Sequence, residues 1–242
     1  MQNSNLSPLY TRVESGGIMK GTLNVRHVDY DLSTSWVKIG PIAGFLGIAA
    51  YFAAATDILP SRVTLVLAFA MGPLLSVAFI GFYHFLRAHR NSVALQIATV
   101  FGVIAGTLVN LMLVVQQSLF IGLPSATRAT MGPAWAGLNW VQLGIDVSWD
   151  LYISVATILL GWVLCKHPRF GIVLGGITIL AGLLLLILNL WTFPIPPGES
   201  GLFDLGPFVG LWFVVLSLRI LFSVKWWSNR YVPAAPMPEK SA

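Results

Sequence analysis

Charged side chains are scarce in this chain. Only 10% of its 242 residues are Asp, Glu, Lys or Arg, whereas 56% are hydrophobic. A soluble domain carries about 25% charged residues, so the composition is explained if lipid covers most of the surface. The net charge of +5 does not indicate nucleic-acid binding, because the basic residues are spread between apolar runs and form no basic domain. We therefore expect a lipid bilayer as partner and no nucleic acid.

Cysteine is nearly absent as well, and the common enzyme motifs are missing. Cys165 is the single cysteine, which excludes an internal disulfide and the zinc or iron–sulfur sites that need several thiolates. The sequence contains no H-E-x-x-H, no G-x-S-x-G, no P-loop and no dinucleotide-binding glycine pattern. No lysine lies in the middle of an apolar run, which excludes a retinal Schiff base. We expect no cofactor and leave metal binding open.

Six apolar runs are long enough to cross a bilayer, which takes about 20 helical residues. They cover residues 39–58, 63–86, 93–119, 134–164, 172–191 and 207–224. Helix-breaking prolines lie between them, for example Pro60, Pro168 and Pro194. The sequence therefore predicts an all-α fold, a polytopic transmembrane six-helix bundle. We expect this bundle to occupy residues 36–228, between a cytoplasmic N-terminal tail, 1–35, and a disordered C-terminal tail, 229–242.

The basic residues predict the orientation of the bundle. With six spans, the two termini and the second and fourth connections share one side of the membrane. Of the 14 Lys and Arg residues, only Arg62 and Arg128 fall on the other side. Because positive charge is retained on the cytoplasmic side, we expect both termini in the cytoplasm. No short apolar core precedes the first run, so we expect that run to act as an uncleaved signal-anchor.

Four polar residues recur at steps of four inside the apolar run 134–164: Gln142, Asp146, Asp150 and Ser154. This spacing places them on one face of a helix. An aspartate near mid-membrane costs about 2.5–3.5 kcal/mol on insertion scales, so both carboxylates must face protein, water or a bound cation. Carboxylates one helical turn apart cannot easily both stay ionised in a partly dry place. The pair is the best candidate site in the chain.

Polar residues of other runs fall at the same predicted depth, in the outer half of the membrane. Asn110 and Gln117 lie seven residues apart on one face of the third run, and Asn189 lies near the outer end of the fifth. Trp149 adjoins Asp150 and could form an aromatic wall for a cationic amine. We predict an outward-facing acidic site that binds or transports a proton, a cation or a small amine, with no catalytic residue. Its members would be Asp146, Asp150, Gln142, Asn110, Gln117, Asn189 and Trp149.

Two other functions remain open. In a structural or accessory subunit, the same polar side chains would only hydrogen-bond between helices, a common form of membrane-protein stabilisation. In an intramembrane enzyme, the Asp pair would act as general acid and base. A second copy of the chain is a further candidate partner, because small residues recur at steps of four and allow close helix approach within or between chains. These pairs are Gly40 and Gly44, Gly102 and Gly106, and Gly171 and Gly175.

The last three runs carry several distinctive segments. Leu-Gly-Ile-Asp-Val-Ser-Trp-Asp occupies 143–150, and His-Pro-Arg-Phe-Gly occupies 167–171. Asn-Leu-Trp-Thr-Phe-Pro-Ile-Pro-Pro follows at 189–197, and Asp-Leu-Gly-Pro at 204–207. This part of the chain resembles an uncharacterised bacterial family of multi-pass integral membrane proteins, known as a domain of unknown function. The resemblance implies a multi-pass protein of the bacterial cytoplasmic (inner) membrane, and it implies no activity.

Overall fold

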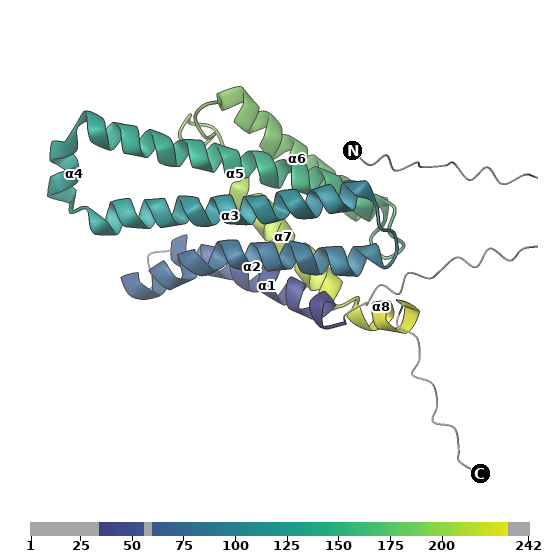
Figure 1. Ribbon diagram of the computed structural model, residues 1–242. Helices are drawn as coiled ribbons and strands as arrows, with labels where there is room; N and C mark the ends of the chain where they lie inside the picture. The colour runs from purple at the N-terminus through teal and green to yellow at the C-terminus, as the bar shows by residue number, and fades with distance from the viewer. Residues whose placement is uncertain (1–33, 56–59, 232–242) are drawn as a thin grey trace, which may run out of the picture. The chain divides into compact units, whose positions relative to one another are not determined.

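The computed structural model describes residues 34–55 and 60–231, and within them the chain is helical and contains no strand. The helices are α1 (Thr34–Ala55), α2 (Ser61–Arg87), α3 (Val93–Gly122), α4 (Ser125–Met131), α5 (Pro133–Cys165), α6 (Gly171–Thr192), α7 (Gly206–Leu221) and α8 (Val224–Tyr231) (Figure 1). The predicted all-α class is confirmed.

Five of these helices are long and apolar enough to cross a membrane: α1, α2, α3, α5 and α6. A sixth span results if α7 and α8 are taken together, with a bend of 49° between them. α7 alone has 16 residues and is about 24 Å long, somewhat less than the roughly 30 Å of a bilayer's hydrocarbon core. The chain is therefore a multi-pass membrane protein with an all-α bundle.

The ends of the bundle differ from the sequence prediction in two places. α1 begins at Thr34, so the last residues of the predicted N-terminal tail, 1–35, are helical, and the rest of that tail lies outside the described residues. α8 runs to Tyr231, so residues 229–231 of the predicted C-terminal tail, 229–242, are helical, and the rest of that tail lies outside the described residues. α8 carries the polar residues Lys225, Asn229 and Arg230, so the predicted apolar run ends at residue 224.

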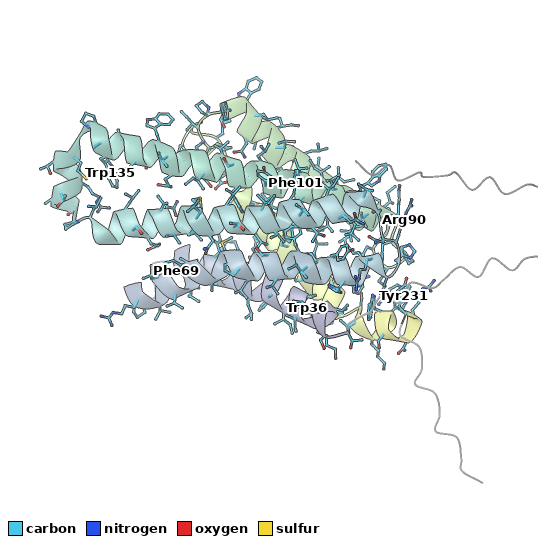
Figure 2. All side chains as sticks on the ribbon, viewed as in Figure 1. Trp36, Phe69, Arg90, Phe101, Trp135 and Tyr231 are labelled. Atoms are coloured by element: carbon cyan, nitrogen blue, oxygen red, sulfur yellow. The ribbon has the colours of Figure 1, made fainter. Side chains whose placement is uncertain are left out.

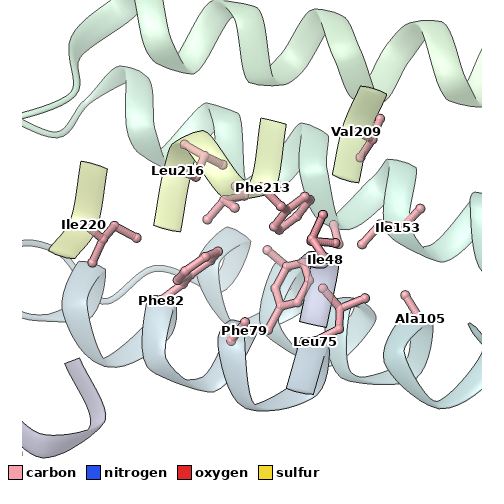
Figure 3. Packing of buried hydrophobic residues seen from close by; sticks show 14 of the residues in the cluster. Ile48, Leu75, Phe79, Phe82, Ala105, Ile153, Val209, Phe213, Leu216 and Ile220 are labelled. Atoms are coloured by element: carbon pink, nitrogen blue, oxygen red, sulfur yellow. The ribbon is translucent and has the colours of Figure 1, made fainter. Parts of the chain in front are cut away.

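Within residues 34–231 the long helices pack mainly against their neighbours in one order: α1 on α2, α2 on α3, α3 on α5, and α5 on α6. α7 packs on α1 and has smaller contacts with α2 and α6. Figure 3 shows Phe213, Leu216 and Ile220 of α7 among buried side chains of α1 and α2, including Ile48, Phe79 and Phe82. α7 therefore completes the core that α1 and α2 begin.

Glycines set the closest helix crossings. At the α1–α2 crossing a Cβ added to Gly40 would overlap the Cα of Gly81, and at the α5–α6 crossing a Cβ on Gly161 would lie 2.8 Å from the Gly175 carbonyl oxygen. Gly44, Gly102 and Gly106 also face other helices of the same chain. All the paired glycines except Gly171 thus pack within the chain, and the homodimer stays a prediction. Gly171 has φ +71° and open space around it, so its glycine suits the turn into α6.

Candidate functional site

A cavity of about 270 Å³ lies between α1, α2, α3, α5 and α7, and residues of the α6–α7 connection also line it. Its polar wall is the α5 face that the sequence marks. Gln142, Asp146, Trp149 and Asp150 all line it, because steps of three and four residues keep them on one side of the helix. The opposite walls are mainly apolar and include Leu75 of α2 and Met112 of α3.

The four carboxylates of the cavity differ in burial. Glu199 and Asp204, in the α6–α7 connection, are exposed, and Asp146 is partly buried. Asp150, one turn further along α5, is only 3% exposed. The side chains therefore form a series of acidic groups that leads from the solvent-facing connection to a buried carboxylate within the bundle.

Asp150 is bound on one oxygen only. The Asn189 Nδ2 of α6 donates a hydrogen bond to Asp150 Oδ2 at 2.9 Å and another to the Leu185 carbonyl oxygen at 3.0 Å. The other oxygen, Asp150 Oδ1, is buried and has no hydrogen-bond partner, and the same holds for Trp149 Nε1. A buried polar atom without a partner costs about 1–3 kcal/mol, so the site has unused hydrogen-bonding capacity for a ligand or water.

Asp204 has a structural role as well. Its Oδ1 accepts the Gly206 backbone N–H at 2.8 Å, which fixes the start of α7 and places negative charge at the positive end of the helix. This contact holds the carboxylate at the cavity wall. Rigid placement of a rim charge contributes to the electrostatic field at the mouth.

The charge of the cavity is of one sign. Every acidic residue in the described part of the chain lines this cavity: Asp146, Asp150, Glu199 and Asp204. None of its lining residues is Lys, Arg or His. Such a cleft attracts cations and repels anions. Among the residues of 34–55 and 60–231, no three His, Cys, Asp or Glu side chains are grouped to hold a metal ion.

Three of the predicted site residues lie outside the cavity wall. Asn189, on α6, contacts the site only through its hydrogen bond to Asp150. Asn110 packs against Gly72 of α2, where its Oδ1 is buried without a partner. Gln117 does not line the cavity, whereas its neighbour Gln116 does. The α3 face toward the cavity is that of Val109, Met112 and Gln116, roughly a third of a turn from the predicted face.

The lining residues that the sequence prediction missed include two aromatic ones. Tyr51 of α1 and Phe213 of α7 both line the cavity. Their helices are apolar on all sides, so no periodic pattern marks a cavity-facing side. Phe213 also contacts Phe79, with ring centroids 5.2 Å apart, and lies nearly parallel to Phe82, at 6.1 Å and 10°. These three rings form a packed aromatic cluster next to the cavity.

No family model, curated protein or solved structure matches this chain. The resemblance of residues 143–221 to an uncharacterised bacterial membrane family therefore stays a prediction.

Proposed function

We propose that this protein binds a proton, a cation or a small amine and either transports it across the membrane or senses it there. An organic ammonium ion is the best candidate. The observation that carries the proposal is Asp150 Oδ1, a buried carboxylate oxygen without a hydrogen-bond partner at a cavity wall. An ammonium N–H would supply both the missing hydrogen bond and the missing counter-charge, which a buried carboxylate needs.

The size and walls of the cavity support an amine. Small-molecule sites usually measure about 300–1,000 Å³, and a volume of about 270 Å³ suits a ligand at the small end of that range. Tyr51, Trp149 and Phe213 contribute aromatic rings to the wall. Aromatic faces attract organic cations through their quadrupole. A divalent metal such as Ca²⁺ takes six to eight oxygen ligands, and the described residues contain no group of three or more His, Cys, Asp or Glu side chains that could hold a metal ion.

The direction of access follows from the predicted topology. By the positive-inside rule the α6–α7 connection, with Glu199 and Asp204, faces the outside of the cell. Beyond the cavity, the cluster of Phe79, Phe82 and Phe213 fills the bundle. These features support an outward-facing site that is closed toward the cytoplasm. The membrane would be the cytoplasmic (inner) membrane of a bacterium, with both termini inside.

A structural role is the second candidate, and the Asp150–Asn189 hydrogen bond favours it. This bond joins α5 to α6 inside the bundle at 2.9 Å, and interhelical hydrogen bonds of this kind stabilise membrane proteins by about 0.6 kcal/mol on average. In that role the protein would be an accessory subunit without a ligand.

Two variants separate the two functions because each removes only one property of Asp150. The double variant Asp146→Asn/Asp150→Asn removes the charge, while the amide oxygen at position 150 can still accept from Asn189. The single variant Asn189→Leu removes the interhelical bond and keeps both carboxylates. Thermal unfolding of each purified protein in neutral detergent would be followed with and without Na⁺, tetramethylammonium, choline and primary alkylamines, and across pH.

A binding site predicts a ligand-dependent rise in the unfolding temperature of wild type and of Asn189→Leu, and none in the double variant, since only a ligand bound to the folded state stabilises it. A scaffold predicts lower stability for Asn189→Leu, no response to any added cation or amine, and the same pH dependence in wild type and the double variant. The second result would overturn the proposed function.

A further inference from the structure

A second, smaller cavity lies where the α2–α3 and α5–α6 connections meet. It has a volume of about 60 Å³. The α2–α3 side contributes His89, Arg90 and Ser92, and the α5–α6 side contributes Lys166 and His167. Figure 2 shows Arg90 at this end of the bundle, with Trp135 at the opposite end.

Apart from Leu86, Ala94, Trp162 and Val163, the lining residues of this pocket are basic or polar, and none of them is acidic. Arg90 and Lys166 are exposed cations. The Nζ of Lys166 lies 4.3 Å from the centre of the Trp162 ring, and Trp162 is also part of the pocket wall. This cation–π contact holds the ammonium group at the pocket. The sign of the charge is thus opposite to that of the acidic cavity.

The backbone adds hydrogen-bond donors. Ser92 is the N-cap of α3, and its Oγ accepts the Leu95 N–H at 3.3 Å. The N–H groups of Val93 and Ala94 belong to the first turn, which has no acceptor within its own helix, and the amino end of a helix favours anions. At the end of α5, the carbonyl oxygens of Val163 and Leu164 already accept backbone N–H groups, at 3.2 Å and 3.0 Å.

His167 adds a buried hydrogen-bond donor that does not depend on the end of α3. It is only 2% exposed, and its ring is held against Phe170 and Phe85, with centroids 4.7 Å and 5.6 Å away. Its Nδ1 accepts the Arg169 backbone N–H at 3.2 Å. In the neutral ring the proton then resides on Nε2, and Nε2 is buried without a hydrogen-bond partner. The pocket is therefore lined by a fixed ring that has a donor to spare.

We infer that this pocket binds a phosphate-bearing anion, with Arg90, Lys166, the Nε2–H of His167 and the first turn of α3 as its donors. A cavity holds a water molecule when it offers about 10–15 Å³, so about 60 Å³ leaves room for a single phosphate group. Basic pockets between transmembrane helices are typical sites for anionic lipid headgroups. A free phosphate has the same chemistry, and the inference does not depend on the function of the acidic cavity.

The test compares two double variants that each remove two exposed cations from this end of the chain. Arg90→Gln/Lys166→Gln alters the pocket, whereas Arg169→Gln/Lys225→Gln is the matched control, because neither Arg169 nor Lys225 lines it. Wild type and both variants would be purified in neutral detergent. Binding of phosphatidylglycerol, phosphatidylcholine and inorganic phosphate would be measured by native mass spectrometry and by thermal unfolding.

We expect wild type and the control to bind phosphatidylglycerol or phosphate, and the pocket variant to bind at least about tenfold more weakly because two charge-assisted hydrogen bonds are lost. Binding of phosphatidylglycerol alone would identify a lipid headgroup as the ligand, and binding of inorganic phosphate would identify a free anion. Equal weakening in both variants, or no preference of wild type for either anion over phosphatidylcholine, would overturn the inference.

Discussion

The indole of Trp227 in α8 donates its Nε1–H to the backbone carbonyl oxygen of Phe85 in α2, at 2.9 Å. Phe85 lies in the last turn of α2, where the carbonyl groups accept no hydrogen bond from within the helix. Trp227 is completely buried, and its ring is stacked on that of Phe85 with centroids 6.3 Å apart. The Trp227 side chain therefore supplies a hydrogen bond to a carbonyl oxygen at the end of α2 and attaches α8 to the bundle.

Substitution of Trp227 by Phe should destabilise the protein by about 1–3 kcal/mol, because the Phe85 carbonyl oxygen loses its partner in a buried place. Trp226→Phe is the matched control, since Trp226 is only half-buried. Chemical unfolding in detergent, followed by far-UV circular dichroism, measures both. Equal losses in the two variants would show that the hydrogen bond contributes nothing specific.

The α1–α2 crossing should tolerate no side chain at Gly81. A Cβ there would overlap the Cα of Gly40 and lie 2.8 Å from the Trp36 carbonyl oxygen, and backbone cannot yield as a flexible side chain does. We expect Gly81→Val to lose at least about 1–3 kcal/mol, the usual cost of overpacking. Gly176→Val in α6 is the control, because no atom lies within 4 Å of its added Cβ. Unfolding temperature and the yield of monodisperse protein would measure the difference. Similar values for both variants would contradict the close approach of α1 and α2 at Gly40 and Gly81.

His167 should make the stability of the protein depend on pH. Burial, with smaller contributions from the nearby His89 and Arg230, lowers the pKa of His167 from 6.5 to about 4. Other cationic groups at the same end, Arg90 and Lys166, line the pocket beside it. Between these two pKa values the unfolded chain binds a proton that the folded protein does not. Stability is therefore complete above pH 6.5 and is lost as the pH falls toward 4.

The variant His167→Asn removes this titration, while an amide oxygen can still accept the Arg169 N–H. Free energies of unfolding measured from pH 7.5 to pH 4 should fall less steeply for the variant than for wild type. The two proteins would run in the same phosphate-free buffer, so that no anion in the pocket shifts the result. Parallel curves would mean that His167 has the same pKa in the folded and the unfolded protein, which would contradict the prediction.

Apolar runs and polar spacing within one helix made much of this fold predictable. The run 93–119 lies within α3, which ends at Gly122, and the steps of four from Gln142 to Asp150 mark a face that lines the acidic cavity. Both are local properties, because a helix repeats every 3.6 residues whatever surrounds it.

Contacts between helices were the part that the sequence did not reveal. Gln117 was predicted at the site and Gln116 lines it, since the rotation of α3 is set by its packing on α2 and α5. Trp227 matches the aromatic residues of a membrane interface in sequence, yet it is buried because α8 bends by 49° from α7 and returns to α2. The partner of Trp227 is 142 residues away, and hydropathy carries no information about such a pair.

The predicted orientation of the bundle can be tested with two engineered cysteines in a Cys165→Ser background. Ser200 lies exposed in the α6–α7 connection, near the carboxylates of the acidic cavity, and Asn229 lies exposed in α8. With both termini in the cytoplasm, Ser200→Cys should react with a membrane-impermeant maleimide in intact cells. Asn229→Cys should react only after the cells are permeabilised, because positively charged segments stay inside.

The outcome also bears on the direction of ligand access, because the α6–α7 connection supplies the exposed acids of the cavity. Labelling of Ser200→Cys from outside would place Glu199 and Asp204 where an external cation meets them first. The reverse pattern, with only Asn229→Cys reacting in intact cells, would put the acidic cavity on the cytoplasmic side and the basic pocket outside. An anionic pocket ligand would then have to come from the outer leaflet or the external medium, which lacks the negative surface potential of the cytoplasmic leaflet.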